Sequence, residues 1–231
     1  MKVFCLPPAG GSAANYIKYV QKSDHYVTFI PIEYPGHGAL LKHNALEDMS
    51  SLVKYVAKKI ADYLSKTDDF IIFGHSMGAM IAYEIAQHLD KNKDDRIRHV
   101  FFCGCVSPAC IIDTYNKYVL MSDDDFVEQI HAFGGIKKEM MNNSVFREVF
   151  LKILRTDFRI ISEYIPRMDE MNISVNIMVA EDDILTKGKY KSWKMFCSNI
   201  DFHIFTGGHF FVFNNPKVLD TLYSYCSILH Q

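Results

Sequence analysis

Residues 70–82 decide the fold, and they read Phe70-Ile71-Ile72-Phe73-Gly74-His75-Ser76-Met77-Gly78-Ala79-Met80-Ile81-Ala82. An apolar run of strand length leads directly into Gly-His-Ser-Met-Gly, and helical spacing follows at once. This order of strand, turn and helix is the required context of the G-x-S-x-G nucleophile elbow. The turn is so sharp that only glycine fits two residues before and two residues after the serine. The Ser76 hydroxyl would stand clear of the sheet at the positive end of the helix, where developing negative charge is favoured. We therefore predict that Ser76 is the nucleophile of a serine hydrolase.

The rest of the chain repeats the alternation of strand and helix. Leu52, Val56 and Ile60 recur every four residues, and Met77, Ile81 and Ile85 do the same, which is typical of helices. Runs that are apolar on both faces suit parallel strands covered by helices on each side. The sequence thus predicts an α/β-hydrolase fold, a mostly parallel sheet flanked by helices, as a single domain over residues 1–231. The predicted strands are Val3–Leu6, Tyr26–Ile32, Phe70–Phe73, Val100–Val106, Val175–Ala180 and Phe202–Phe205.

The alternation breaks between about residues 111 and 166, where no strand is evident and three helix-like pieces occur. One piece opens at Ser122-Asp123-Asp124-Asp125, an N-cap followed by an acidic first turn, and this suits a helix better than a calcium loop. We expect the insertion to be a helical lid. Several of its apolar residues either line a pocket or pack helices together, and the sequence leaves both open: Phe126, Ile130, Phe133 and Met140.

Composition excludes several classes of protein. The chain has 231 residues, 49% of them hydrophobic and 23% charged, with a formal net charge of −2. That charge gives no reason to expect nucleic acid or an anionic membrane as a partner. The first residues have no apolar core typical of a signal peptide, and no run reaches the length of a membrane span. We expect a cytoplasmic monomer with no cofactor of its own.

The six cysteines lie in apolar runs, where isolated cysteine acts as a small buried hydrophobe. One group of residues suggests a zinc site: His99, Cys103, Cys105 and Cys110. The single residue between Cys103 and Cys105 is too short a gap for paired zinc ligands, and in a strand it places the two side chains on opposite faces. We predict core cysteines and no metal.

A serine nucleophile needs a general base, and His209 is the best placed of the ten histidines. It follows the predicted strand Phe202–Phe205 through Thr206-Gly207-Gly208, and so lies on a glycine-rich loop at the carboxyl end of a strand. Catalytic groups of α/β sheets gather at that edge. His75 adjoins Ser76, but side chains of neighbouring elbow residues point in different directions, so we predict that it is a packing residue.

The third residue of a triad should be a carboxylate between serine and histidine in the sequence. Glu181, Asp182 and Asp183 all follow the strand Val175–Ala180, and the pattern alone does not choose among them. An oxyanion hole also needs two backbone N–H donors. One should be that of Met77, directly after the nucleophile. For the other we predict Ala9, in the glycine-rich loop after the first strand, although that loop could also be a simple turn.

Together, four motifs resemble those of the type II thioesterases that serve nonribosomal peptide and polyketide synthases. They are Leu6-Pro7-Pro8-Ala9-Gly10-Gly11-Ser12-Ala13, Tyr34-Pro35-Gly36-His37-Gly38, the elbow, and Gly207-Gly208-His209-Phe210-Phe211. The resemblance runs from near residue 3 to the C-terminus. It implies that Asp183 is the catalytic carboxylate, with Asp182 as the fallback, because Asp183 stands ten residues before Trp193 and 26 before His209, much as in the family.

The resemblance further implies a substrate: an acyl thioester on the phosphopantetheine arm of an acyl or peptidyl carrier protein. Hydrolysis would clear stalled or wrongly primed groups from the synthase. Two departures from the family pattern are Ala79, where many members have glycine, and the early start of the chain, which could omit an N-terminal strand.

Three other functions compete with this interpretation. A small-molecule esterase or lipase would use the same triad, since a triad does not distinguish an oxygen ester from a thioester. A releasing domain cut from a synthase is disfavoured because the start of the chain resembles that of a free-standing protein. A non-catalytic binding module is disfavoured because Ser76, Asp183 and His209 are all present.

Overall fold

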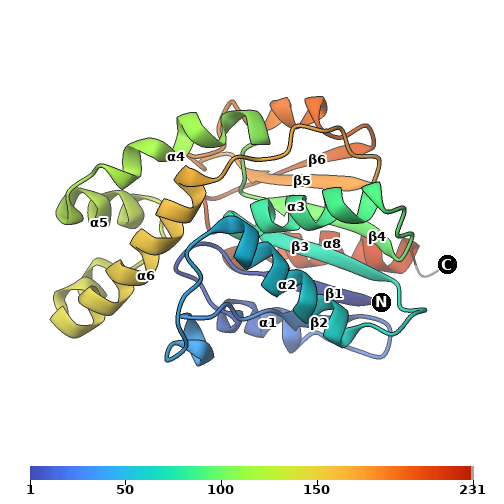
Figure 1. Ribbon diagram of the computed structural model, residues 1–231, viewed down its shortest axis with the longest axis horizontal. Coiled ribbons are helices and arrows are strands. Elements are labelled where there is room, and N and C mark those ends of the chain that lie inside the picture. The colour runs from blue at the N-terminus through green and yellow to red at the C-terminus, as the bar shows by residue number, and fades with distance from the viewer. Residues whose placement is uncertain (230–231) are drawn as a thin grey trace.

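A six-stranded sheet with every strand parallel forms the centre of the molecule (Figure 1). The computed structural model describes residues 1–229. The strand order is β2-β1-β3-β4-β5-β6. The first strand thus lies beside the edge strand β2, and β3 to β6 follow in sequence order toward the other edge. The strands are β1 (Lys2–Leu6), β2 (Thr28–Pro31), β3 (Phe70–His75), β4 (Ile97–Cys103), β5 (Val175–Ala180) and β6 (Ile200–Phe205).

All six predicted strands are present, and the predicted parallel sheet flanked by helices is confirmed. The fourth differs most from its prediction, since it begins at Ile97 and ends at Cys103 rather than at Val106. The chain leaves the sheet there because Gly104 adopts φ +57°, a left-handed conformation that breaks a strand.

Side chains of successive strand residues belong alternately to two separate hydrophobic clusters, one on each face of the sheet. Phe4 and Leu6 belong to the larger cluster, whereas Val3 and Cys5 belong to the smaller one. The neighbouring inner strands β1 and β3 are buried at nearly every position, as expected for parallel strands covered on both sides.

Helices cover each face. The larger cluster includes the apolar stripes of α2 (Met49–Tyr63) and α3 (Met77–Lys91), and the smaller one includes those of α8 (Pro216–Ile228) and the segment through α1 (Ile17–Val20). Asp48 caps α2 by accepting a hydrogen bond from the Ser51 N–H at 2.8 Å. The remaining short elements are η1 (Ala13–Tyr16), η2 (Gly38–Leu40), η5 (Tyr190–Met195) and α7 (Phe211–Asn214).

The segment between β4 and β5 is helical and lies beyond the carboxyl ends of the strands (Figure 1). Ser122 caps α5 as expected, accepting from the Asp125 N–H at 3.2 Å. Aromatic side chains join the helices, and Phe126 meets Phe158 edge to face at 5.0 Å between ring centroids. The segment comprises η3 (Pro108–Cys110), α4 (Ile111–Val119), α5 (Asp123–Ala132), η4 (Lys138–Asn142) and α6 (Ser144–Glu163).

The cysteines of the candidate zinc site lie apart. Cys103 packs in the smaller cluster and Cys105 in the larger, on opposite faces of the sheet, while His99 pairs with the Asn176 side chain. Within residues 1–229, no group of three or more histidine, cysteine or carboxylate side chains is arranged to hold a metal ion. None of the helices in that range is long and apolar enough to cross a membrane.

Candidate active site

Ser76 occupies a strained turn between β3 and α3. Its φ of 54° and ψ of −117° place a non-glycine residue in a region that costs about 1–3 kcal/mol and is typical of functional sites. The flanking glycines are needed because a Cβ on Gly74 would lie 2.3 Å from the Gly78 carbonyl oxygen. One on Gly78 would lie 2.1 Å from the Leu6 carbonyl oxygen. The elbow is therefore packed directly against the end of β1.

His209 reaches Ser76 from the other end of the chain. Its Nε2 lies 3.1 Å from the Ser76 Oγ, within hydrogen-bond distance for proton transfer. Gly207, with φ +113°, turns the chain after β6 so that the imidazole faces the elbow. Both side chains are almost fully buried.

Asp183 completes the arrangement, and the geometry separates it from its two neighbours. Its Oδ2 lies 3.0 Å from the His209 Nδ1, and the residue is fully buried, whereas Glu181 and Asp182 are exposed. The Leu185 N–H and the Thr186 hydroxyl also donate to the Asp183 carboxylate, at 3.0 and 2.9 Å. Burial alone would raise the pKa of Asp183, but the charge and hydrogen bond of His209 and these two donors hold it below its ordinary value. Asp183 is therefore an ionised group that fixes the Nδ1–H tautomer of His209.

His75 packs as predicted but also bonds to the site. Burial, and secondly the nearby His209, lower the pKa of His75 to about 3, so its ring is neutral. The His75 Nε2 lies 2.9 Å from the backbone carbonyl oxygen of His209 and must donate to it. The ring also meets Phe210 and Phe213 edge to face. Sequence reasoning assigned this residue to packing alone, because the bond spans 134 positions of the chain.

Two backbone donors lie beside the nucleophile. The Met77 N–H opens the first turn of α3, and Ala9 lines the same small cavity as Ser76. Among the described residues, neither the Ala9 nor the Met77 N–H donates to another backbone or side-chain group. Donors left free in this way are what an oxyanion hole requires.

The cavity at Ser76 is small and roofed by the helical insertion. It has a volume of about 30 Å³, close to that of a single water molecule. Ile130 and Phe133 line it, whereas Phe126 packs inside the insertion and Met140 is exposed. The residues around the cavity are Pro8, Ala9, Ser76, Tyr115, Ile130, Phe133, Leu154, Phe158, Ile161, Leu185, His209 and Phe210.

Tyr115, from α4, is the functional candidate that sequence reasoning missed. Its side chain is buried against the cavity, and its hydroxyl lies near that of Ser76 but makes no hydrogen bond of acceptable geometry to any described group. Burial, with smaller contributions from Cys105 and Asp183, raises the pKa of Tyr115, and the neighbouring Ser76 hydroxyl offsets this only in part. A neutral phenol without a partner is a donor available to a bound substrate. A tyrosine in an amphipathic helix gives no sequence signal of this role.

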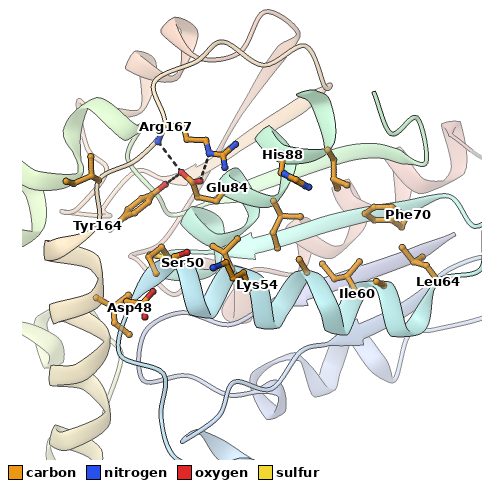
Figure 2. A pocket seen from close by; sticks show the side chains of 18 of the residues that line it. Asp48, Ser50, Lys54, Ile60, Leu64, Phe70, Glu84, His88, Tyr164 and Arg167 are labelled. Atoms are coloured by element: carbon orange, nitrogen blue, oxygen red, sulfur yellow. Dashed lines mark hydrogen bonds and ion pairs between the residues drawn. The ribbon is translucent and has the colours of Figure 1, made fainter. Parts of the chain in front are cut away.

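A much larger cavity lies elsewhere in the described part of the chain. It measures about 700 Å³ and runs between α2, α3 and the end of α6, and no member of the triad lines it (Figure 2). At one end, Glu84 of α3 accepts hydrogen bonds from the Tyr164 hydroxyl and the Arg167 N–H. The Arg167 guanidinium also lies 3.2 Å from the same carboxylate. These contacts of Glu84 therefore connect the C-terminus of α6 to α3, the helix that follows the nucleophile.

Comparison with known proteins agrees with this geometry. The model of the thioesterase domain family matches residues 1–226. Linear gramicidin dehydrogenase LgrE of Brevibacillus parabrevis is 26% identical over 235 residues, covering 96% of this chain and 88% of LgrE. AMB antimetabolite synthetase AmbE of Pseudomonas aeruginosa is 24% identical over all of this chain, which spans only 10% of AmbE.

Among solved structures, the RedJ thioesterase from the prodiginine pathway of Streptomyces coelicolor superimposes with a TM-score of 0.84 at 26% identity. That match covers 96% of this chain and 89% of RedJ. The family predicted from the four motifs is thus confirmed, and the chain belongs to the thioesterase domain family of α/β-hydrolase enzymes.

Proposed function

We propose that this enzyme hydrolyses acyl thioesters held on the phosphopantetheine arm of carrier proteins, as an editing thioesterase of nonribosomal peptide or polyketide synthesis. One observation carries the proposal: Ser76, His209 and Asp183 form a continuous hydrogen-bonded chain beside two free backbone N–H groups. The similarity to a thioesterase of a biosynthetic pathway supports the choice of thioester over oxygen ester.

The first half-reaction follows from these positions. The Ser76 Oγ attacks the thioester carbonyl carbon while its proton passes to the His209 Nε2. The Ala9 and Met77 N–H groups bind the oxygen that gains negative charge. The C–S bond then breaks, and His209 returns the proton to the departing thiolate of the arm.

In the second half-reaction, water attacks the acyl-Ser76 ester and gives a proton to His209. The C–Oγ bond breaks, the proton returns to the Ser76 Oγ, and the free acid leaves. Asp183 stays ionised throughout and stabilises the imidazolium in both steps. The products are the free carboxylic acid and the carrier with a free thiol, ready for reloading.

Tyr115 is assigned a role in substrate contact. Its hydroxyl shares the cavity with Ser76 and lacks an internal partner, so it is placed to donate to an oxygen of the bound acyl thioester. No other side-chain hydroxyl apart from those of Ser76 and Tyr115 borders the cavity within the described residues.

A substrate comparison tests the proposal. We expect kcat/KM for an acetyl-loaded peptidyl carrier domain to exceed that for acetyl-CoA and for p-nitrophenyl acetate, because the carrier adds binding surface that the small substrates lack. Ser76→Ala should abolish turnover of all three. Preference for p-nitrophenyl acetate with no action on the loaded carrier would keep the hydrolase chemistry and reject the carrier assignment.

A further inference from the structure

Asp157, from α6, joins three segments that are far apart in the sequence. Its Oδ2 accepts a hydrogen bond from the Gly10 N–H at 2.7 Å and lies 2.9 Å from the His37 Nε2. Asp157 is 1% exposed and His37 is 5% exposed, so both are shielded from solvent. One carboxylate thus connects the roof of the active site to the loop that carries Ala9 and to the loop after β2.

The contacts of His37 fix its charge. Its Nδ1 lies 3.1 Å from the Pro35 carbonyl oxygen and its Nε2 faces the Asp157 carboxylate, and both of these oxygens are acceptors. Both ring nitrogens must therefore donate, which requires the imidazolium form. Burial lowers the pKa of His37, but the hydrogen bond and charge of Asp157 outweigh it, and the Pro35 carbonyl and Glu33 add to the increase. The net pKa of His37 is raised, in agreement with the geometry.

The loop that Asp157 holds is the one predicted to form the oxyanion hole. Gly10 has φ +66°, and a Cβ there would lie 2.5 Å from the Leu154 side chain, so α6 presses closely on this loop. The Tyr34 hydroxyl donates to the Pro7 carbonyl oxygen at 3.1 Å and ties the same loop to the segment that carries His37. Asp157 and Leu154 lie three residues apart, on the face of α6 that meets the loop.

The far end of α6 is held independently. The Tyr164 hydroxyl and Arg167 N–H donate to Glu84, as Figure 2 shows, and this fixes the helix to α3 beyond the catalytic cavity. Among the described residues, the hydrogen bonds and the ion pair of Glu84 are with Tyr164 and Arg167, and not with the Ala9 loop or the triad, so Glu84 is a matched control for Asp157.

We propose that the Asp157–His37 ion pair positions the loop after β1. Asp157 holds the Gly10 N–H so that the adjacent Ala9 N–H points at the oxyanion. This inference rests on the proposed serine-hydrolase chemistry but not on the carrier-protein substrate. Asp157 does not touch the reacting atoms; it acts through the backbone of the loop. The ion pair also makes the position of that loop depend on the charge of His37, which faces Asp157 of α6 and Glu33 of the loop after β2.

The test compares Asp157→Ala with Glu84→Ala, using p-nitrophenyl acetate as the substrate. Loss of one oxyanion donor lowers kcat by about 10²–10³-fold, so a displaced donor should cost about 10–100-fold. We expect Asp157→Ala to lower kcat by that amount with KM changed less than twofold. Glu84→Ala should destabilise the protein but keep kcat within twofold of wild type. Equal kcat in the two variants would overturn the proposal.

The pH profile provides a second readout. The ion pair is complete below the ordinary histidine pKa and is lost as pH rises through the raised pKa of His37. Wild-type kcat should therefore fall on the alkaline side, and that fall should be absent in Asp157→Asn, whose amide oxygen still accepts from Gly10 but does not stabilise the imidazolium. If Asp157→Ala does not fold, the comparison of pH profiles still tests the proposal, and an alkaline fall that persists in Asp157→Asn would contradict it.

Nitrogen-15 NMR of the histidine side chains gives the most direct check of charge. Both ring nitrogens of His37 should carry protons at pH 6, and only one should in Asp157→Asn. A neutral His37 in the wild-type protein at that pH would contradict the proposal. Turnover of p-nitrophenyl acetate needs only Ser76 chemistry, so failure of the loaded carrier as a substrate would leave this result intact.

Discussion

The His75 Nε2 lies 2.9 Å from the backbone carbonyl oxygen of His209, so the residue beside the nucleophile holds the loop of the general base. The neutral state of His75, with its pKa lowered to about 3, keeps this bond unchanged across the working range of pH. Ser76 and His209 are thus connected twice, through the side-chain contact at 3.1 Å and through His75.

Replacement of His75 tests this second connection. His75→Phe preserves the aromatic contacts with Phe210 and Phe213 but leaves the buried His209 carbonyl without a donor. We expect kcat to fall about 10-fold with little change in KM, since a misplaced general base affects the chemical step. His75→Gln, whose amide also donates, should recover part of the loss. Steady-state kinetics with p-nitrophenyl acetate measures both variants, and equal activity in the two would argue that His75 only packs.

Tyr115→Phe should separate activity from stability. Removal of a buried hydroxyl that has no internal partner relieves a desolvation cost, so the free energy of unfolding should be unchanged or higher by about 1 kcal/mol. If the hydroxyl donates to the substrate, kcat/KM should fall about 10-fold for the loaded carrier. Tyr118→Phe, three residues along the same helix but outside the cavity lining, is the matched control. Unchanged kcat/KM in Tyr115→Phe would remove Tyr115 from the substrate-binding groups.

The lowered pKa of Asp183 predicts how the free energy of unfolding depends on pH. Its pKa is lowered in the folded protein, so its contribution to stability is present above the unfolded value of about 4 and is lost as pH falls through the lowered value. Asp183→Asn should reduce kcat by about 10⁴-fold, because the amide favours the wrong His209 tautomer.

Urea unfolding at a series of pH values checks the stability part. The difference in free energy of unfolding between wild type and Asp183→Asn should be constant above about pH 5 and should shrink below pH 4. A difference that grows in acid would show that Asp183 is protonated in the folded enzyme.

Gly78→Ala should destabilise the elbow itself. A Cβ there would lie 2.1 Å from the Leu6 carbonyl oxygen, and relief of that overlap requires the strand end and the helix start to separate. We expect a loss of about 3 kcal/mol in the free energy of unfolding. Gly208→Ala is the control, because a Cβ at Gly208 meets no atom within 4 Å, and its stability should stay within about 0.5 kcal/mol of wild type. Thermal and urea unfolding measure both.

The sequence predicted those parts of the molecule that depend on local patterns. Strand β3 opens with four apolar residues and β5 is apolar at every position except Asn176, and the elbow at Ser76 needs glycines at fixed spacing. Both features could therefore be identified from short stretches. The choice of Asp183 over Glu181 and Asp182 needed the family resemblance, because burial of one carboxylate among three adjacent ones is decided by tertiary packing.

Long-range polar contacts were not predictable in the same way. Asp157 and His37 are separated by 120 positions, and His75 and His209 by 134. The sequence around each residue contains no pattern that indicates its partner. Tyr115 was equally hidden, since its role depends on the absence of a partner inside a cavity that only the folded insertion creates.

The most direct test of the central claim follows the intact mass of an acetyl-loaded carrier domain over time with wild-type enzyme and with Ser76→Ala. Circular dichroism would show that both proteins are folded. The triad geometry predicts that the wild-type enzyme converts an excess of acetylated carrier to the free-thiol form over many turnovers. Ser76→Ala should leave the carrier acetylated. Release of the acetyl group by Ser76→Ala at the wild-type rate would contradict the assignment of Ser76 as the nucleophile.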